Sequence, residues 1–142
     1  MKIAKLLRLD FLPSNTNLAL LLLRTWIGAT MFILHGWGKV TGFGEMSGKF
    51  LNLFGIGSTA SLALAIFGEA VCSVLLIFGL FTRLAALCGI ITMTVAFTIA
   101  HNAVLRGPGS GELAFIYLAT YVVLFIAGPG RFSVDAKMGG KV

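Results

Sequence analysis

Residues 18–37 read LALLLLRTWIGATMFILHGW, an apolar run interrupted by a single charged residue, Arg24. About 20 mostly apolar residues are enough for a helix to cross the hydrocarbon core of a bilayer. Comparable apolar segments follow at about 58–80, 84–104 and 113–127. The sequence therefore predicts an all-α fold, a polytopic four-helix bundle in a membrane.

The composition leads to the same prediction. Of the 142 residues, 58% are hydrophobic and only 11% are charged, whereas about 25% of the residues of a soluble domain carry charge. Too few polar side chains are available to cover a soluble surface, so lipid must solvate most of the chain. Four spans use nearly all of residues 1–142, which we expect to form a single membrane domain. The net charge of +6 is spread over loops and tails, a distribution that does not indicate nucleic-acid binding.

The segments beside the spans carry turn-forming and charged residues. Residues 1–12 place apolar side chains at helical spacing with basic ones between them, which is typical of an interfacial helix lying on a membrane surface. We expect an interfacial or re-entrant loop over residues 36–57. Residues 106–111, RGPGSG, predict a glycine-rich outer loop, and residues 128–142 predict a polar tail.

The distribution of basic residues predicts the orientation. Four spans place both termini on one side of the membrane, and that side carries Lys2, Lys5, Arg8, Arg83, Arg131, Lys137 and Lys141. The opposite side carries Lys39, Lys49 and Arg106. Because basic loops tend to remain in the cytoplasm, we expect both termini to be cytoplasmic.

Ionisable residues inside the spans are candidates for function, because each costs roughly 2.5–3.5 kcal/mol at the bilayer centre. Arg24 shares a helical face with Gly28, Met31 and His35. At about 1.5 Å rise per residue, Arg24 and Glu69 lie roughly 9 and 16 Å from the inner ends of their spans. The two side chains could therefore pair. Such a pair could fix the register of the helices, or it could anchor a ligand, a proton or a quinone carbonyl.

A second polar group lies near the outer ends of the spans. It contains His35, His101 and Glu112, and Lys39 lies just beyond. Two imidazoles and a carboxylate can bind a metal, relay protons or hydrogen-bond a quinone, although an interfacial histidine can also be simply solvated. No helix carries an HxxxH or HExxH motif, so the sequence predicts no metal site.

Several stretches resemble the DoxX family of small bacterial four-helix membrane proteins. They are LLLRTWIGATMFILHGWGKV (21–40), FGEAVCSVLLIFGLFTRLAAL (67–87), MTVAFTIAH (93–101) and ELAFIYLATYVVLFIAGPGRFSVD (112–135). The family's recurrent polar positions correspond to Arg24, His35, Lys39, Glu69, Arg83, His101, Glu112, Arg131 and Asp135. The resemblance implies a multi-pass protein of the bacterial inner membrane, similar to the membrane subunits linked to thiosulfate:quinone oxidoreduction. We expect Arg83, Arg131 and Asp135 to form a structural clasp at the cytoplasmic face.

Three functions are compatible with these residues. The first is a quinone-linked redox membrane protein, or the membrane subunit of an oxidoreductase complex. In this hypothesis His35 or His101 is the hydrogen-bond or proton partner of the quinone, Glu69 accepts a proton, and Arg24 gives electrostatic support. No motif for a covalently bound cofactor occurs, so a partner subunit would have to carry the electrons. The second is a non-catalytic accessory subunit packed against a larger membrane complex. The third, a small transporter, is disfavoured because no inverted repeat is visible. The sequence assigns no catalytic residue and does not decide whether the protein is an enzyme.

Overall fold

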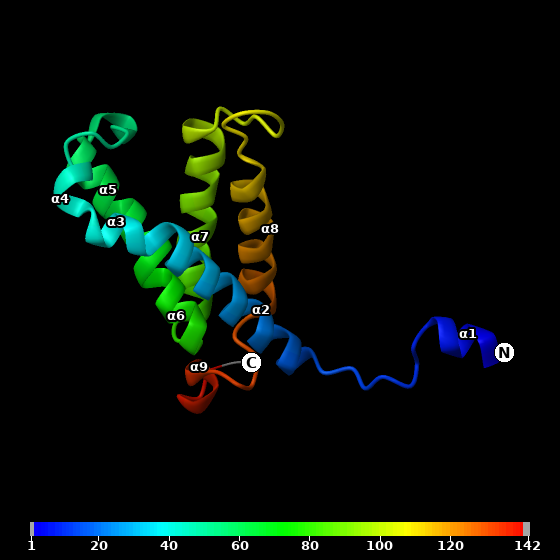
Figure 1. Ribbon diagram of the computed structural model, residues 1–142. Helices are drawn as coiled ribbons and strands as arrows, with labels where there is room; N and C mark the ends of the chain where they lie inside the picture. The colour runs from blue at the N-terminus through cyan, green and yellow to red at the C-terminus, as the bar shows by residue number, and fades with distance from the viewer. Residues whose placement is uncertain (1, 141–142) are drawn as a thin grey trace.

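The computed structural model describes residues 2–140, and every regular element within that range is a helix (Figure 1). The predicted all-helical membrane fold is confirmed. Lys141 and the side chain of Lys2, both counted for the predicted orientation, lie outside the described part. In chain order the elements are α1 (Lys2–Leu7), α2 (Thr16–Met31), η1 (Phe32–Gly36), α3 (Trp37–Thr41), α4 (Phe43–Met46), η2 (Leu53–Gly55), α5 (Ser58–Ile66), η3 (Phe67–Val71), α6 (Cys72–Phe78), α7 (Thr82–Val95), η4 (Ala96–Ala100), α8 (Glu112–Ala127) and α9 (Val134–Lys137).

Three continuous helical stretches are long and apolar enough to cross a membrane. They are Thr16–Thr41, formed by α2, η1 and α3; Ser58–Phe78, formed by α5, η3 and α6; and Thr82–Ala100, formed by α7 and η4. The fourth helix, α8, has 16 residues, and at about 1.5 Å per residue it is shorter than a hydrocarbon core of about 30 Å. It packs along α7 and completes the bundle.

The helices are close together at one end of the bundle and separate at the other (Figure 1). We call the end with residues 79–81 and 128–140 the tail end, and the end with residues 42–57 and 101–111 the loop end. Towards the tail end, α2 packs against α6, and α7 packs against both α6 and α8. Towards the loop end, α3, α4 and α5 lean away from α7 and α8. This divergence leaves space between the two groups of helices.

Glycines allow the closest helix contacts of the tail-end half. A Cβ atom at Gly28 would lie 2.8 Å from the carbonyl oxygen of Ser73, and one at Gly89 would lie 2.8 Å from the ring of Tyr121. Because these positions lack side chains, α2 approaches α6 and α7 approaches α8. The resulting core buries Tyr121 almost completely, at 1% exposure.

Arg24 caps the C-terminal end of α6. Its Nη1 donates hydrogen bonds to the carbonyl oxygens of Leu76 at 3.0 Å and Ile77 at 2.6 Å, and its Nη2 donates to the carbonyl oxygen of Phe132. The side chain is buried. The last carbonyls of a helix lack intrahelical partners, and a cation there also interacts favourably with the helix dipole. Arg24 therefore holds α2, α6 and the segment after α8 together.

The pair expected between Arg24 and Glu69 does not form. Glu69 lies seven residues before Leu76, which places it about two helical turns farther from the tail end. Its carboxylate binds Lys39 instead. The carbonyl groups of Leu76 and Ile77, at the end of α6, lie closer to Arg24 and accept its hydrogen bonds.

Asp135 joins the tail to the turn between α6 and α7. Its carboxylate accepts hydrogen bonds from the backbone N–H groups of Phe81 at 2.7 Å and Thr82 at 2.9 Å, and its own N–H donates to the carbonyl oxygen of Gly79 at 2.9 Å. A carboxylate at the start of α7 satisfies N–H groups that lack intrahelical partners, and it interacts favourably with the helix dipole.

The other two residues of the expected clasp contribute less. Arg83 is exposed, and its Nη2 lies 3.4 Å from the carbonyl oxygen of Ile126. Arg131 acts through its main chain, since its backbone N–H donates to Oδ1 of Asn17 at 2.9 Å. The tail end therefore depends mainly on Arg24 and Asp135.

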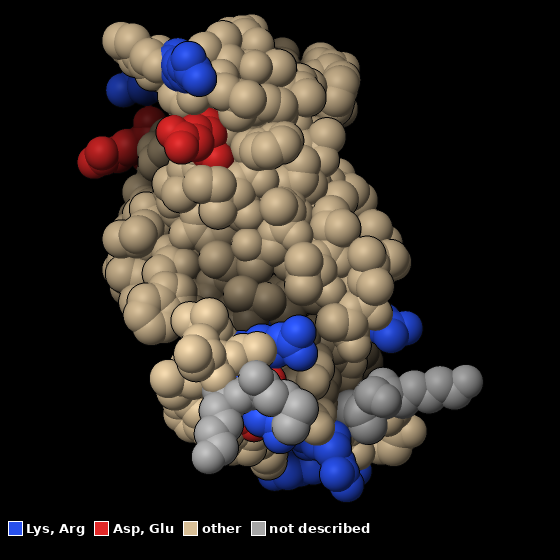
Figure 2. Space-filling model, turned by 90° about the vertical axis from the view of Figure 1, so that its right-hand side faces the viewer, with Lys and Arg blue, Asp and Glu red and all other residues tan. Residues whose placement is uncertain are grey.

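The surface of the bundle is divided by charge. Figure 2 shows charged side chains gathered towards the two ends of one face, with an uncharged band between them. Large apolar side chains such as Trp26, Ile91 and Ile126 are exposed on the long helices, as expected for helices surrounded by lipid. The short helix α1 stands apart from the bundle (Figure 1), and its Ile3 and Leu7 are exposed as well.

We expect Arg24→Met to destabilise the bundle, because the carbonyl groups of Ile77 and Phe132 lose the donor that Arg24 supplies, and that of Leu76 keeps only its bond from the N–H of Gly79. The free energy of unfolding in detergent micelles should fall by about 2–5 kcal/mol. Arg83→Met is the matched control, because this exposed arginine should change stability by no more than about 0.5 kcal/mol. Equal effects of the two substitutions would contradict the capping role of Arg24.

Candidate functional site

A cavity of about 690 Å³ occupies the space between the diverging helices, and we call it the loop-end pocket. Pockets that bind small molecules commonly have volumes of about 300–1,000 Å³. The lining comes from all four helical stretches, from the segment before α5 and from the loop before α8. It consists of Met31, His35, Lys39, Phe50, Leu51, Leu53, Phe54, Ile56, Leu64, Ala65, Phe67, Glu69, Cys88, Ile91, Thr92, Met93, Val95, Ala96, Ala100, His101, Ser110, Leu113, Ala114 and Tyr117.

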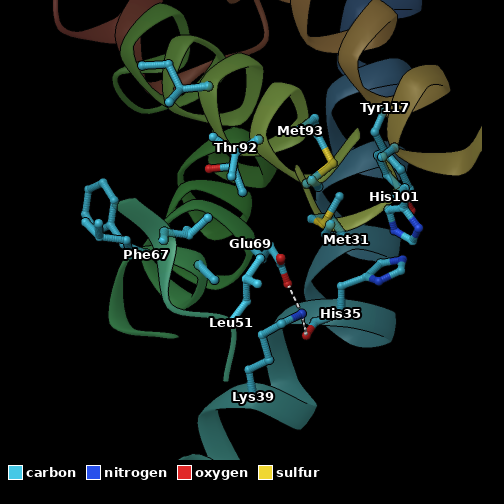
Figure 3. A pocket seen from close by; sticks show the side chains of 18 of the residues that line it. Met31, His35, Lys39, Leu51, Phe67, Glu69, Thr92, Met93, His101 and Tyr117 are labelled. Atoms are coloured by element: carbon cyan, nitrogen blue, oxygen red, sulfur yellow. Dashed lines mark hydrogen bonds and ion pairs between the residues drawn. The ribbon is translucent and has the colours of Figure 1, made fainter. Parts of the chain in front are cut away.

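An ion pair lies in the wall of this pocket. Nζ of Lys39 is 2.5 Å from Oε2 of Glu69 and also donates to the carbonyl oxygen of His35 at 3.3 Å (Figure 3). The side chains of Lys39 and Glu69 are only 19% and 10% exposed. Two opposite charges this close neutralise each other, so the pair supplies hydrogen-bonding groups without adding net charge to the pocket.

The two histidines line the same cavity. Nε2 of His35 is buried and has no hydrogen-bond partner within residues 2–140. Nδ1 of His101 lies 2.8 Å from the carbonyl oxygen of Gly109. Because a carbonyl oxygen only accepts hydrogen bonds, this Nδ1 carries the proton, and Nε2 of the neutral ring is an acceptor. Figure 3 shows both rings towards one side of the pocket.

Tyr117 contributes the aromatic wall near the histidines. Its ring meets the ring of His35 edge to face, with centroids 5.8 Å apart, and it is 5% exposed. Met31 and Met93 are also buried beside the pocket. Methionine side chains are adaptable and make favourable contacts with aromatic rings, so this end of the pocket suits a flat ring with polar substituents.

Three π-helical turns surround the pocket, and such turns occur frequently at functional sites. Each is closed by a backbone hydrogen bond over five residues, from Trp37 to Phe32 in η1, from Cys72 to Phe67 in η3 and from His101 to Ala96 in η4. A π turn inserts one residue into the α-helical repeat and so rotates the faces of the helix on either side of it.

The π turn η1 explains why His35 faces the pocket. The buried positions of this stretch are Arg24, Gly28 and Met31, followed by Gly36. A continuous α-helix would have kept His35 on that buried face. The extra residue moves the buried position on to Gly36 and leaves His35 free to line the cavity.

Gly36 brings two of the π turns into direct contact. A Cβ atom at this position would lie 2.7 Å from the carbonyl oxygen of Glu69 and 3.0 Å from Cα of Ala70. Because no side chain is present, η1 lies directly against η3. The helix continues past Gly36 into α3, which places Lys39 within reach of Glu69.

The structure brings together four of the six residues predicted as ligand or proton sites. His35, Lys39, Glu69 and His101 all line the loop-end pocket. Arg24 lies at the tail end, and Glu112 is exposed at the start of α8, outside the pocket lining. Within residues 2–140, no group of three His, Cys, Asp or Glu residues is placed to hold a metal ion.

Sequence reasoning missed the contribution of the segment before α5. Residues 50–56 supply five of the pocket-lining side chains, although the sequence predicts only an interfacial or re-entrant loop there. Hydrogen bonds hold this segment in place, from Leu53 N–H to Ser61 Oγ at 3.0 Å and from Gly57 N–H to Asn52 Oδ1 at 2.8 Å. The signal in the sequence is the apolar character of Phe50, Leu51, Leu53, Phe54 and Ile56.

The sequence pattern of the DoxX family matches residues 19–102, more than half of the chain. The chain belongs to the DoxX family. An uncharacterised protein of Haemophilus influenzae is 36% identical to it over 120 residues, covering 77% of this chain and 83% of the relative. The inner membrane protein YqjF of Escherichia coli is 30% identical over 116 residues, covering 78% of this chain and 85% of YqjF. No solved structure matches the chain.

Alanine substitutions at Gly36 and Gly38 of this DoxX-family protein should change the free energy of unfolding in opposite directions. Gly36→Ala places a methyl group against the backbone of η3, and we expect it to lower the free energy of unfolding by about 1–3 kcal/mol. At Gly38, an added Cβ would meet no atom within 4 Å among the described residues beyond its chain neighbours and the backbone of its own helix, so Gly38→Ala should raise helix stability by about 0.5–1 kcal/mol. Unfolding in detergent micelles measures both values, and a neutral Gly36→Ala would contradict the close contact of η1 with η3.

Proposed function

We propose that this DoxX-family protein binds the headgroup of a membrane quinone in the loop-end pocket, as the membrane subunit of a quinone-linked redox complex. One observation carries the proposal. A mainly apolar cavity holds a charge-neutral cluster of hydrogen-bonding groups, formed by His35, Lys39, Glu69 and His101. A quinone has the same character, since it is a neutral ring with polar oxygens.

The hydrogen-bonding capacity of the cluster matches a quinone carbonyl. An ammonium group has three N–H donors, and Lys39 uses two of them on Glu69 and on the carbonyl oxygen of His35. The third donor is available to a ligand oxygen. An anionic lipid headgroup suits the site less well, because Glu69 already neutralises the cation and would repel a phosphate.

In this proposal, this chain exchanges protons with the quinone and a partner subunit supplies the electrons. Reduction of a quinone to its hydroquinone consumes two electrons and two protons. Imidazole and carboxylate groups can exchange protons with the ligand, and His35, His101 and Glu69 supply them here. Because the sequence has no motif for a covalently bound cofactor, the electrons would come from a partner subunit that carries flavin, haem or iron–sulfur groups.

The same proposal places the protein in the bacterial inner membrane, the location given in the name of the relative YqjF. Near the tail end, in α1 and directly after it, the exposed basic side chains of the described residues are Lys5, Arg8, Arg83, Arg131 and Lys137. Their excess over Lys39, Lys49 and Arg106 supports a cytoplasmic tail end under the positive-inside rule. The loop-end pocket would then lie in the periplasmic half of the bilayer.

His35→Leu should weaken quinone binding by about tenfold, the effect of losing about one hydrogen bond. The measurement is an equilibrium titration of the purified protein with a decyl-tailed 1,4-benzoquinone. Glu112→Gln is the matched control, because Glu112 is an ionisable residue near the same end of the bundle that does not line the pocket. Its dissociation constant should equal that of the unsubstituted protein.

The competing function is an accessory subunit without a ligand. It predicts that the unsubstituted protein binds no quinone, either in micelles or after gentle purification with its native partners. It also predicts that His35→Leu leaves both assembly and turnover of the complex unchanged. That combination of results would overturn the quinone proposal.

A further inference from the structure

The loop-end pocket reaches the lipid-facing surface between α5 and α7. Three of its lining residues are apolar side chains with large exposed fractions: Leu64 at 57%, Phe67 at 48% and Ile91 at 57%. Leu64 lies on α5, Phe67 begins η3 and Ile91 lies on α7. Apolar side chains that line a cavity and are still this exposed mark the edge of an opening in its wall.

The opening between α5 and α7 ends where η3, which directly follows α5, touches α7. At Gly68 an added Cβ atom would lie 2.1 Å from Oγ1 of Thr92, so η3 and α7 are in direct contact at this level and nothing can pass between them. From this contact towards the loop end, α5 leans away from α7 (Figure 1). On the α7 side, the pocket-lining side chains at this contact and beyond it are Ile91, Thr92 and Val95, whereas Cys88 lines the pocket one helical turn nearer the tail end.

The polar cluster and the opening lie on different sides of the cavity. Figure 3 shows Phe67 at the edge of the pocket away from His35 and His101, with Glu69 between them. A molecule that fills the pocket would therefore have a polar end near the histidines and an apolar end directed towards the acyl chains of the bilayer.

We infer that the gap bordered by Leu64, Phe67 and Ile91 is a lateral portal, through which the hydrocarbon tail of the quinone remains in the bilayer while its ring occupies the loop-end pocket. The inference rests on the proposed function and adds the route of entry and the class of ligand. The ligand is an amphiphile with a neutral headgroup and a single long tail, and it enters from lipid.

Ile91→Trp tests the portal by narrowing the gap from the α7 side. Leu84→Trp is the matched control: Leu84 lies seven residues earlier on the same helix, is 59% exposed and does not line the loop-end pocket. Both variants are titrated with two ligands, a decyl-tailed 1,4-benzoquinone and the same ring without the tail. We expect Ile91→Trp to weaken binding of the tailed quinone by about tenfold, with binding of the tailless ring unchanged. Leu84→Trp should change neither.

A second variant separates narrowing of the gap from a local effect of Ile91→Trp on α7. Leu64→Trp narrows the gap from the α5 side and should produce the same loss for the tailed ligand alone. If the unsubstituted protein binds both rings but the two portal variants weaken both ligands equally, or weaken neither, the portal is overturned and the proposed function stands. If the unsubstituted protein binds neither ring, the proposed function itself is overturned.

Discussion

The carbonyl groups at the end of α6 impose the constraint on which the rest of the structure depends. In hydrocarbon an unpaired backbone polar group costs several kcal/mol, and a helix leaves its last carbonyls without intrahelical partners. Arg24 supplies donors to Leu76 and Ile77 and, from the same guanidinium group, to Phe132. One side chain thereby joins α2, α6 and the segment that follows α8.

The fixed tail end determines how the helices are arranged at the loop end. Gly79 adopts a positive φ of 67°, and a Cβ there would lie 2.7 Å from Nη1 of Arg24, so the turn into α7 is tight and its geometry is set by the guanidinium group. Asp135 secures the start of α7 from the opposite side. Because the tail end is held in this way, the helices can diverge towards the loop end without losing their mutual register. The loop-end pocket is the space that this divergence creates.

Local sequence features predicted the helices but not the partners of their polar residues. Apolar runs of about 20 residues indicate spans directly, and the depth of His35 and His101 near one end followed from simple counting. The pairing of Lys39 with Glu69 did not follow, because it requires η1 to lie against η3 at Gly36, and a π turn has no clear signature in one sequence. The contribution of residues 50–56 depends on tertiary contacts of an irregular segment, which periodicity does not report.

Arg24 and Lys39 lie in the same helical stretch, but their hydrogen-bond donors are used differently. The hydrogen bonds of Arg24 go to backbone carbonyls that the fold must satisfy, and the group is sealed at 1% exposure. Lys39 retains donor capacity beside a cavity.

A buried ion pair such as Lys39 and Glu69 contributes little net stability, because the cost of desolvation offsets the attraction. An apolar pair would fill the same wall without that cost. The physical consequence specific to the ion pair is a polar, charge-neutral surface inside an apolar pocket, and such a surface suits a neutral amphiphile.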